Sequence, residues 1–179
     1  MKKTLISKTL PLILAGVLIA SVVCAQEDKS KRSSPPATAT GHVMDATITI
    51  NYSSPAVNGR KIWGGLVPYD SVWRAGANEA TIFETDKNIE VEGKNLPAGK
   101  YSLYAIPGAK QWVIIVSGQT GQWGINRDHK TTEDPVNDVL RVNVTPKKSS
   151  TFNERLKYVI NDNGFSLEWE NIEVPVSIQ

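Results

Sequence analysis

Apolar and polar residues alternate along much of the chain beyond residue 45. In residues 46–52 the apolar Ala46, Ile48 and Ile50 fall on one face, with threonine and asparagine between them. The same two-residue period recurs in three further segments, residues 101–106, 138–145 and 165–169. Successive side chains of a β-strand point to opposite faces, so these segments are predicted to be half-buried strands.

Residues 111–117 show a different pattern, with apolar and mostly β-branched side chains on both sides. This predicts a strand covered on both faces, and we place it at the centre of a sheet. Residues 80–85 and 88–92 are also predicted strands. We expect them to pair as a tight hairpin across the polar turn at residues 86–87.

The C-terminal part of the chain is predicted to be a hairpin followed by one more strand. Residues 152–160 resemble a short helix, but the Asn-Asp-Asn-Gly sequence at residues 161–164 is typical of a hairpin turn, so we interpret them as a strand. Residues 172–178 alternate again. Pro175 lies on the face opposite their apolar residues. It indicates an edge strand, because the backbone of proline cannot donate a hydrogen bond to a neighbouring strand.

Some eight or nine short strands, with no long helical period after residue 25, predict an all-β fold, an antiparallel β-sandwich or jelly roll. At 179 residues, one domain is expected. Residues 26–40 are polar and rich in serine, threonine and proline, so we predict a flexible, disordered linker there. The domain is expected to begin near Gly41 and to span residues 41–179.

The longest interruption of the pattern is the segment of residues 53–79. It shows neither the two-residue period of a strand nor the 3.6-residue period of a helix. Glycine and proline punctuate it, yet it contains two tryptophans and several aliphatic residues that can offset the entropy of ordering it. Long irregular connections in compact domains are often functional. We therefore expect an ordered loop that carries the candidate functional residues.

The N-terminus has the features of an export signal. A basic start is followed by an apolar run from Leu10 to Val23, shorter than the roughly 20 residues that a membrane-spanning helix needs. We predict a signal peptide of residues 1–25, cleaved after Ala25, a periplasmic or secreted protein, and no transmembrane segment in the mature chain. Alternatively, Cys24 becomes the lipidated first residue of an anchored lipoprotein.

Cleavage after Ala25 changes both the cysteine count and the charge. It removes the single cysteine, which leaves no disulfide, thiolate nucleophile or thiolate metal site. It also removes three of the 20 basic residues, leaving 17 against 18 acidic ones and a charge of −1. With no net positive field, nucleic acid is not an expected partner.

Metal and cofactor sites are not expected. The two histidines, His42 and His129, lie in neither a His-x-His nor a His-Glu-x-x-His pattern. His42 and Met44 could form a soft ligand pair for copper, but a linker-end histidine beside a core methionine is the favoured interpretation. A calcium site would draw on Asp128, Glu133, Asp134 and Asp138. For these, an acidic solvated loop is favoured.

The aromatic and polar residues of the loop, with one tryptophan of a second loop, are the strongest candidates for function. Aromatic rings offer flat apolar faces, while arginine, asparagine and glutamate offer directional hydrogen bonds, a mixture that suits a sugar or small polar ligand. The candidate residues are Arg60, Trp63, Trp73, Arg74, Asn78, Glu79 and Trp123. The structural alternative is that tryptophans packed beneath the loop, and arginines bonded to backbone carbonyls, pin it without any ligand.

Glu79 is also the candidate catalytic residue, as the acid or base of a hydrolase. This hypothesis requires a raised pKa and a second carboxylate, drawn from Asp70 or Asp138, facing it across a cleft. The chain contains no Gly-x-Ser-x-Gly elbow, and nothing in it indicates a Ser-His-Asp triad.

Long motifs in residues 51–60, 62–69, 72–81 and 96–107, with shorter ones at 138–142 and 167–169, resemble the bacterial secreted family called domain of unknown function 2911. The resemblance covers nearly all of the mature domain and implies an exported β domain with no known activity. The residues that match the family motifs are Arg60, Trp73, Arg74, Asn78, Glu79, Thr81 and Arg141. None has an established role, and Arg141 joins the candidate ligand-binding residues.

Three functions remain open at this level. The favoured one is a non-catalytic binding module for a glycan or small polar ligand. The second is a hydrolase acting on a cell-envelope or carbohydrate substrate through Glu79. The third is a structural or protein-interaction domain with no small-molecule site, in which Trp73→Ala would unfold the protein by leaving a large core void.

Overall fold

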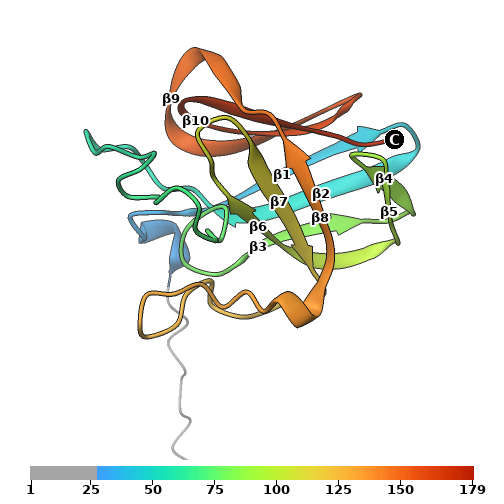
Figure 1. Ribbon diagram of the computed structural model, residues 1–179, viewed down its shortest axis with the longest axis horizontal. Coiled ribbons are helices and arrows are strands. Elements are labelled where there is room, and N and C mark those ends of the chain that lie inside the picture. The colour runs from blue at the N-terminus through green and yellow to red at the C-terminus, as the bar shows by residue number, and fades with distance from the viewer. Residues whose placement is uncertain (1–27) are drawn as a thin grey trace, which may run out of the picture.

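The computed structural model describes residues 28–179, which form an all-β domain (Figure 1). The expected signal peptide, its cleavage after Ala25 and the alternative lipid anchor at Cys24 lie outside the described residues. The helical segments within residues 28–179 are two short 3₁₀ turns, η1 (Lys29–Lys31) and η2 (Pro135–Asn137). No helix in this range is long and apolar enough to cross a membrane.

Ten strands in antiparallel sheets make up the domain. They are β1 (Pro36–Val43), β2 (Ala46–Ser53), β3 (Thr81–Thr85), β4 (Ile89–Val91), β5 (Lys94–Leu96), β6 (Gly99–Ile106), β7 (Trp112–Ser117), β8 (Asp138–Val144), β9 (Lys147–Asn161) and β10 (Gly164–Ser177). One sheet has six strands in the order β1-β2-β3-β6-β7-β8, while β9 with β10 and β4 with β5 form two-stranded sheets. The prediction of an antiparallel all-β fold is confirmed.

The six-stranded sheet and the long β9–β10 hairpin share one hydrophobic core (Figure 1). Ile48 and Ile50 of β2, Leu156 of β9 and Val174 of β10 are all fully buried in it. Alternation explains the arrangement, because the apolar positions of β2 enter the core and the threonines between them stay partly exposed. The two layers therefore pack as in a β-sandwich.

β7 is buried on both faces, as its continuous apolar pattern predicts. Ile114 enters the main core, whereas Ile115 on the opposite face packs in a second small cluster with Tyr104 and Ala80. The strand lies between β6 and the edge strand β8, so it is an inner strand of the sheet but not its central one. Both faces of the sheet are thus covered at this point.

The hairpin predicted for residues 80–85 and 88–92 is wrong. β3 pairs with β2 and β6, while β4 pairs with β5. The reason lies in backbone conformation: Glu92 and Gly93, between β4 and β5, have φ values of 50° and 75°, as a two-residue hairpin turn requires. The tight turn therefore follows β4 rather than preceding it.

The predicted linker is also corrected, because β1 begins at Pro36, five residues before the predicted domain start at Gly41. β1 pairs with β2 along its whole length, from Pro36 opposite Ser53 to Val43 opposite Ala46. Small residues alternate with threonine here, so the two-residue period exists without the bulky apolar residues that reveal a strand. The prediction of disorder is wrong for residues 36–40.

The segments 165–169 and 172–178, predicted as separate strands, form the single strand β10. Its pairing with β9 shifts register on both sides of Glu170, which has a φ of 54°. Such a bulge bends a strand without ending it. Its paired register with β9 ends at Glu173, before Pro175.

Candidate functional site

The loop that joins β2 to β3, residues 54–80, is ordered by backbone hydrogen bonds to several strands. Trp73 and Ala105 of β6 exchange two of them, with N–O distances of 2.7 and 2.8 Å. The Val57 N–H donates to Glu154 O at 2.8 Å, so the loop also contacts β9. An ordered loop was expected from its apolar content.

The backbone of this loop adopts unusual conformations. Four non-glycine residues have positive φ, a region that costs free energy for side chains with a Cβ: Asn58, Asp70, Ala75 and Asn78. Asparagine and aspartate tolerate this region better than alanine does. Ala75 at φ 51° is therefore the most strained of the four, and the surrounding packing holds it there, since its side chain is buried in the core.

Four tryptophans from distant parts of the chain meet beneath the loop. Trp63 lies at the centre, edge-on to Trp73, Trp112 and Trp169 with ring centroids 4.8 to 5.8 Å apart. Trp73 and Trp169 stack on each other at 6.0 Å with an interplanar angle of 18°. Offset and edge-to-face geometries are the favourable ones for aromatic rings, so the cluster is a rigid base for the loop.

A cavity of about 300 Å³ opens above this cluster, and we call it the tryptophan cleft. Among its lining residues are Ser33, Ser34, Arg60, Leu66, Trp73, Arg74, Asn78 and Trp169. Four of the residues proposed from the sequence are thus brought together: Arg60, Trp73, Arg74 and Asn78. Of the residues that the structure describes, the two arginines are the only charged ones that line it.

Arg60 and Asn78 are anchored to the backbone around the cleft. The Arg60 guanidinium donates from Nε to Val57 O at 3.1 Å and from Nη2 to Ala56 O at 2.5 Å. Asn78 donates from Nδ2 to Ser34 O at 2.9 Å. Both side chains therefore pin the loop, as the structural alternative expects, and line the cleft as well.

Arg74 has a different environment. It is half-buried, its Nε is fully buried, and within residues 28–179 that nitrogen has no hydrogen-bond partner. Burial lowers the pKa of its guanidinium, because it disfavours the charged form. The aliphatic stem lies against Gly124 so closely that a Cβ at position 124 would meet Arg74 Cβ at 2.9 Å. The side chain is thus held in place by packing rather than by an ion pair.

Glu79 does not line the tryptophan cleft, and its carboxylate binds the N-terminal strap, which we define as residues 28–35. Lys29 Nζ lies 2.7 Å from Glu79 Oε1, and Arg32 Nη1 lies 3.1 Å from both carboxylate oxygens. Partial burial raises the pKa of Glu79, but the hydrogen bonds from Lys29, the backbone and Arg32 outweigh it and lower the pKa to about 2. This is opposite to the raised pKa that the hydrolase hypothesis requires.

The two remaining tryptophans of the candidate set have separate roles. Trp63 is only 7% exposed, belongs to the core and is not among the residues that line the cleft. Trp123 is 46% exposed, and the Arg32 guanidinium lies 5.6 Å from its ring centroid. That cation–π contact adds to the attachment of the strap.

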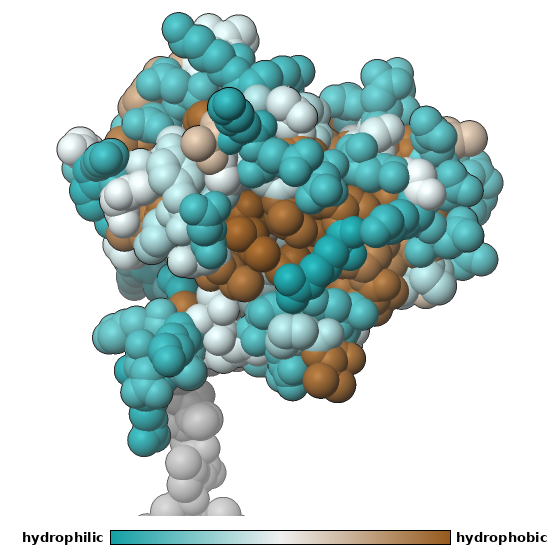
Figure 2. Space-filling view, in the orientation of Figure 1, coloured by the Kyte–Doolittle hydropathy of each residue, from teal (hydrophilic) through white to brown (hydrophobic). Residues whose placement is uncertain are grey.

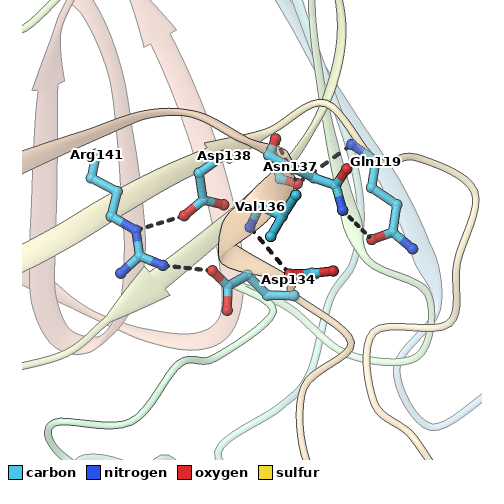
Figure 3. A network of polar contacts seen from close by, with 8 residues as sticks. Gln119, Asp134, Val136, Asn137, Asp138 and Arg141 are labelled. Carbon is cyan, nitrogen blue, oxygen red and sulfur yellow. Dashed lines mark hydrogen bonds and ion pairs between the residues drawn. The ribbon is translucent and has the colours of Figure 1, made fainter.

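Arg141, on β8, belongs to a different network, shown in Figure 3. Its Nε donates to Asp138 Oδ2 at 2.6 Å and its Nη2 to Glu133 Oε1 at 2.7 Å. These bonds satisfy its charge, and the pKa of Arg141 is raised, first of all by the Asp138 hydrogen bond. Arg141 does not line the tryptophan cleft.

The same network holds two of the acidic residues considered for calcium, Glu133 and Asp138. Burial, followed by the charge of Asp138, raises the pKa of Glu133. A third, Asp134, accepts from Val136 N at 3.1 Å and caps η2. Within residues 28–179, no three histidine, cysteine or acidic side chains are arranged to hold a metal ion.

Three residues that line the cleft from outside the loop were missed by the sequence analysis: Ser33, Ser34 and Trp169. The serines lie in the strap, whose polar composition predicted a linker. Trp169 follows Phe165 and Leu167 in the alternating pattern of β10, which predicts a core residue, and its side chain is indeed only 1% exposed. An available signal was the position of Trp169 on the inward face of an alternating strand.

Two other surface features contain none of the candidate residues. A larger open hollow of about 470 Å³ is lined by residues of β8, β9 and β10, and its Lys147 and Glu173 form an ion pair at 2.9 Å. Figure 2 shows hydrophobic residues over β7 and β8 in the middle of one face, with hydrophilic side chains around them.

Comparison with known proteins gives one match. The model of the family described as "Protein of unknown function (DUF2911)" matches residues 34–178, which include the loop, the tryptophan cluster and all ten strands. No curated protein and no solved structure matches the chain.

Proposed function

The chain belongs to the DUF2911 family, and from that premise we propose that it is a non-catalytic binding module that holds a glycan or other small polar ligand in the tryptophan cleft. One observation carries the proposal: the stacked pair Trp73 and Trp169 lines the same cavity as Arg60, Arg74 and Asn78. Aromatic faces with a few convergent polar groups are typical of small-molecule sites.

The dimensions of the cleft support a ligand of the size of one or two sugar rings. Its volume of about 300 Å³ is at the lower end of the range found for ligand pockets, roughly 300–1,000 Å³. The four-tryptophan base and the backbone bonds of Arg60 and Asn78 hold the lining in position before a ligand arrives. Such preorganisation reduces the entropy that binding must overcome.

The environment of Glu79 argues against the hydrolase alternative. A general acid must be protonated near the working pH, whereas the pKa of Glu79 is about 2. Its oxygens are engaged by Lys29 and Arg32, and in the described part of the chain no carboxylate lines the tryptophan cleft. The proposed module therefore binds its ligand without changing it.

The same proposal places the module in the periplasm or outside the cell, supported by the signal pattern of residues 1–25. N-terminal sequencing of the exported protein is expected to begin at Gln26. A chain that remains with the membrane fraction, and leaves it in a Cys24→Ser variant, would instead support the lipoprotein.

Calorimetric titration with a panel of mono- and disaccharides tests the binding function. Leu66 is 47% exposed and lines the cleft, so Leu66→Trp is expected to fill the cleft and abolish binding without removing a core residue. Val136→Trp, at a position that is 89% exposed in η2, is the matched control and should bind as wild type does. Equal affinity of the two variants, or no binding by the wild-type protein to any compound of the panel, would refute the proposal.

A further inference from the structure

Among residues 28–179, the charged side chains that line the tryptophan cleft are all of one sign. Arg60 and Arg74 line it, and none of the described carboxylates does. The acidic groups in the neighbourhood are already engaged: Glu79 binds Lys29 and Arg32, and Glu154 accepts from the Asn58 N–H at 2.9 Å. Within residues 28–179, neither Arg60 nor Arg74 forms an ion pair with a carboxylate.

Arg74 makes this imbalance significant. A charge that is partly removed from water is costly unless it is paired and hydrogen-bonded. Arg74 is half-buried, its Nε is enclosed, and in the described part of the chain this nitrogen meets no acceptor. Its stem is fixed against Gly124, so packing restricts its movement out to solvent. The cost would be recovered if a ligand supplied the missing negative charge.

We infer that the ligand carries an oxyanion, a carboxylate or a phosphate, and that Arg74 binds this group while Trp73, stacked on Trp169, contacts the rest of the molecule. The inference rests on the proposed function and names the chemical class of its ligand. Guanidinium groups bind both oxyanions through paired hydrogen bonds, which gives the site direction as well as charge. Arg60, with two of its donors held by backbone carbonyls, supplies the second positive charge.

Three sugars of similar size test the inference: glucose, glucuronate, which carries a carboxylate, and glucose 6-phosphate. Their affinities are measured from the quenching of tryptophan fluorescence, because two tryptophans line the cleft. At least one acidic sugar is expected to bind about 10- to 100-fold more tightly than glucose, as a hydrogen-bonded charge pair predicts. Sodium chloride should weaken the binding of the acidic sugar and leave the binding of glucose unchanged.

Arg74→Gln removes the charge and retains a polar side chain, so it should abolish the preference for acidic sugars. Arg74→Lys keeps the charge without the planar fork and should lose only part of it. Arg127→Gln removes the same charge from an exposed position in another loop and should behave as wild type. Thermal melting of each variant shows whether it is folded. If Arg74→Gln does not fold, Arg74→Lys tests the inference.

The two proposals fail in different ways. If glucose binds as tightly as both acidic sugars, or if Arg74→Gln retains the preference, the oxyanion inference is overturned while the binding function stands. If no sugar binds and the cleft-filling variant Leu66→Trp changes nothing, the binding function itself is overturned. Retention of the preference in Arg127→Gln, with its loss in Arg74→Gln, supports both.

Discussion

Arg74 and Trp63 come from the same loop, eleven residues apart, and have opposite environments. The Trp63 ring is enclosed by three other indoles, whereas Arg74 lines a cavity and its Nε has no hydrogen-bond partner among residues 28–179. The first belongs to the core, and the second is the residue to which we assign a ligand contact. Residue type alone could not separate these roles, because a tryptophan in a loop serves equally well in a core or in a binding surface.

Trp63→Ala is expected to lower the free energy of unfolding by about 3–5 kcal/mol, because it leaves a large void at the centre of the tryptophan cluster. Urea denaturation monitored by the fluorescence of the remaining tryptophans measures this change. Trp123→Ala is the control. At 46% exposure with one cation–π contact, it should cost less than about 1 kcal/mol. Similar losses for the two variants would contradict the burial of Trp63.

The pKa of Glu79 predicts a pH dependence of stability. Its folded-state pKa of about 2 lies below the usual 4.5, so its contribution is present above about pH 4.5 and is lost as the pH falls towards 2. Since the side chain is 37% exposed, the contribution is about 1 kcal/mol. Glu79→Gln should thus be less stable than wild type at pH 7 and lose most of this difference by pH 2, in urea titrations at each pH.

Glu84→Gln provides the comparison for this experiment. Glu84 forms one exposed ion pair with Lys100 at 3.5 Å, and its removal should change stability little at any pH. A constant difference between wild type and Glu79→Gln from pH 7 to pH 2 would show that the strap contacts do not depend on the carboxylate charge.

Among the elements, the N-terminal strap departs most from the sequence-based expectation. Its composition predicts a linker, yet Ser34 O accepts from Asn78 and Pro35 O accepts from the Ser54 N–H at 2.8 Å. A segment with few apolar residues is held here by polar contacts to a surface that is itself ordered. Composition alone carries no information about such a partner, because the contacts join residues that lie far apart in sequence.

The β9–β10 hairpin was predictable because its turn chemistry is local, and its glycine gives a test. Gly164 has a φ of 138°, and a Cβ there would collide with the backbone oxygen of Val176. Gly164→Ala should therefore destabilise the protein by roughly 1–3 kcal/mol or more in urea denaturation. Gly93→Ala, at a φ of 75° with open space around it, should cost about 1 kcal/mol. A larger loss at Gly93 would contradict the close approach at Gly164.

At the scale of the whole molecule, one core joins the large sheet, the long hairpin and the loop. Its members include Ile48 of β2, Trp63 of the loop and Val176 of β10. Unfolding of any one layer would expose the core side chains of the others, so unfolding should occur in one step. Urea transitions followed by tryptophan fluorescence and by amide I infrared absorption are expected to coincide. Two separated midpoints would show that the hairpin and the sheet unfold independently.

The sequence predicts much of this architecture, because alternation identifies strands such as β2 and β8 wherever one face is apolar. It could not predict which strands become neighbours. The pairing of β4 with β5 depends on the positive φ of Glu92, a residue type that rarely adopts it. The cleft could not be predicted either, because Trp169 lines it from a distant part of the chain and a local pattern does not show such contacts.

The tryptophan cluster also has an optical consequence. Four indoles packed with ring centroids 4.8 to 6.4 Å apart are close enough for their excited states to mix. The far-ultraviolet circular dichroism of this protein should therefore contain an exciton couplet from the rings, superimposed on the signal of the peptide groups. A spectrum interpreted through peptide absorption alone would misjudge the strand content, whereas the couplet itself would report directly on whether the four rings are still assembled.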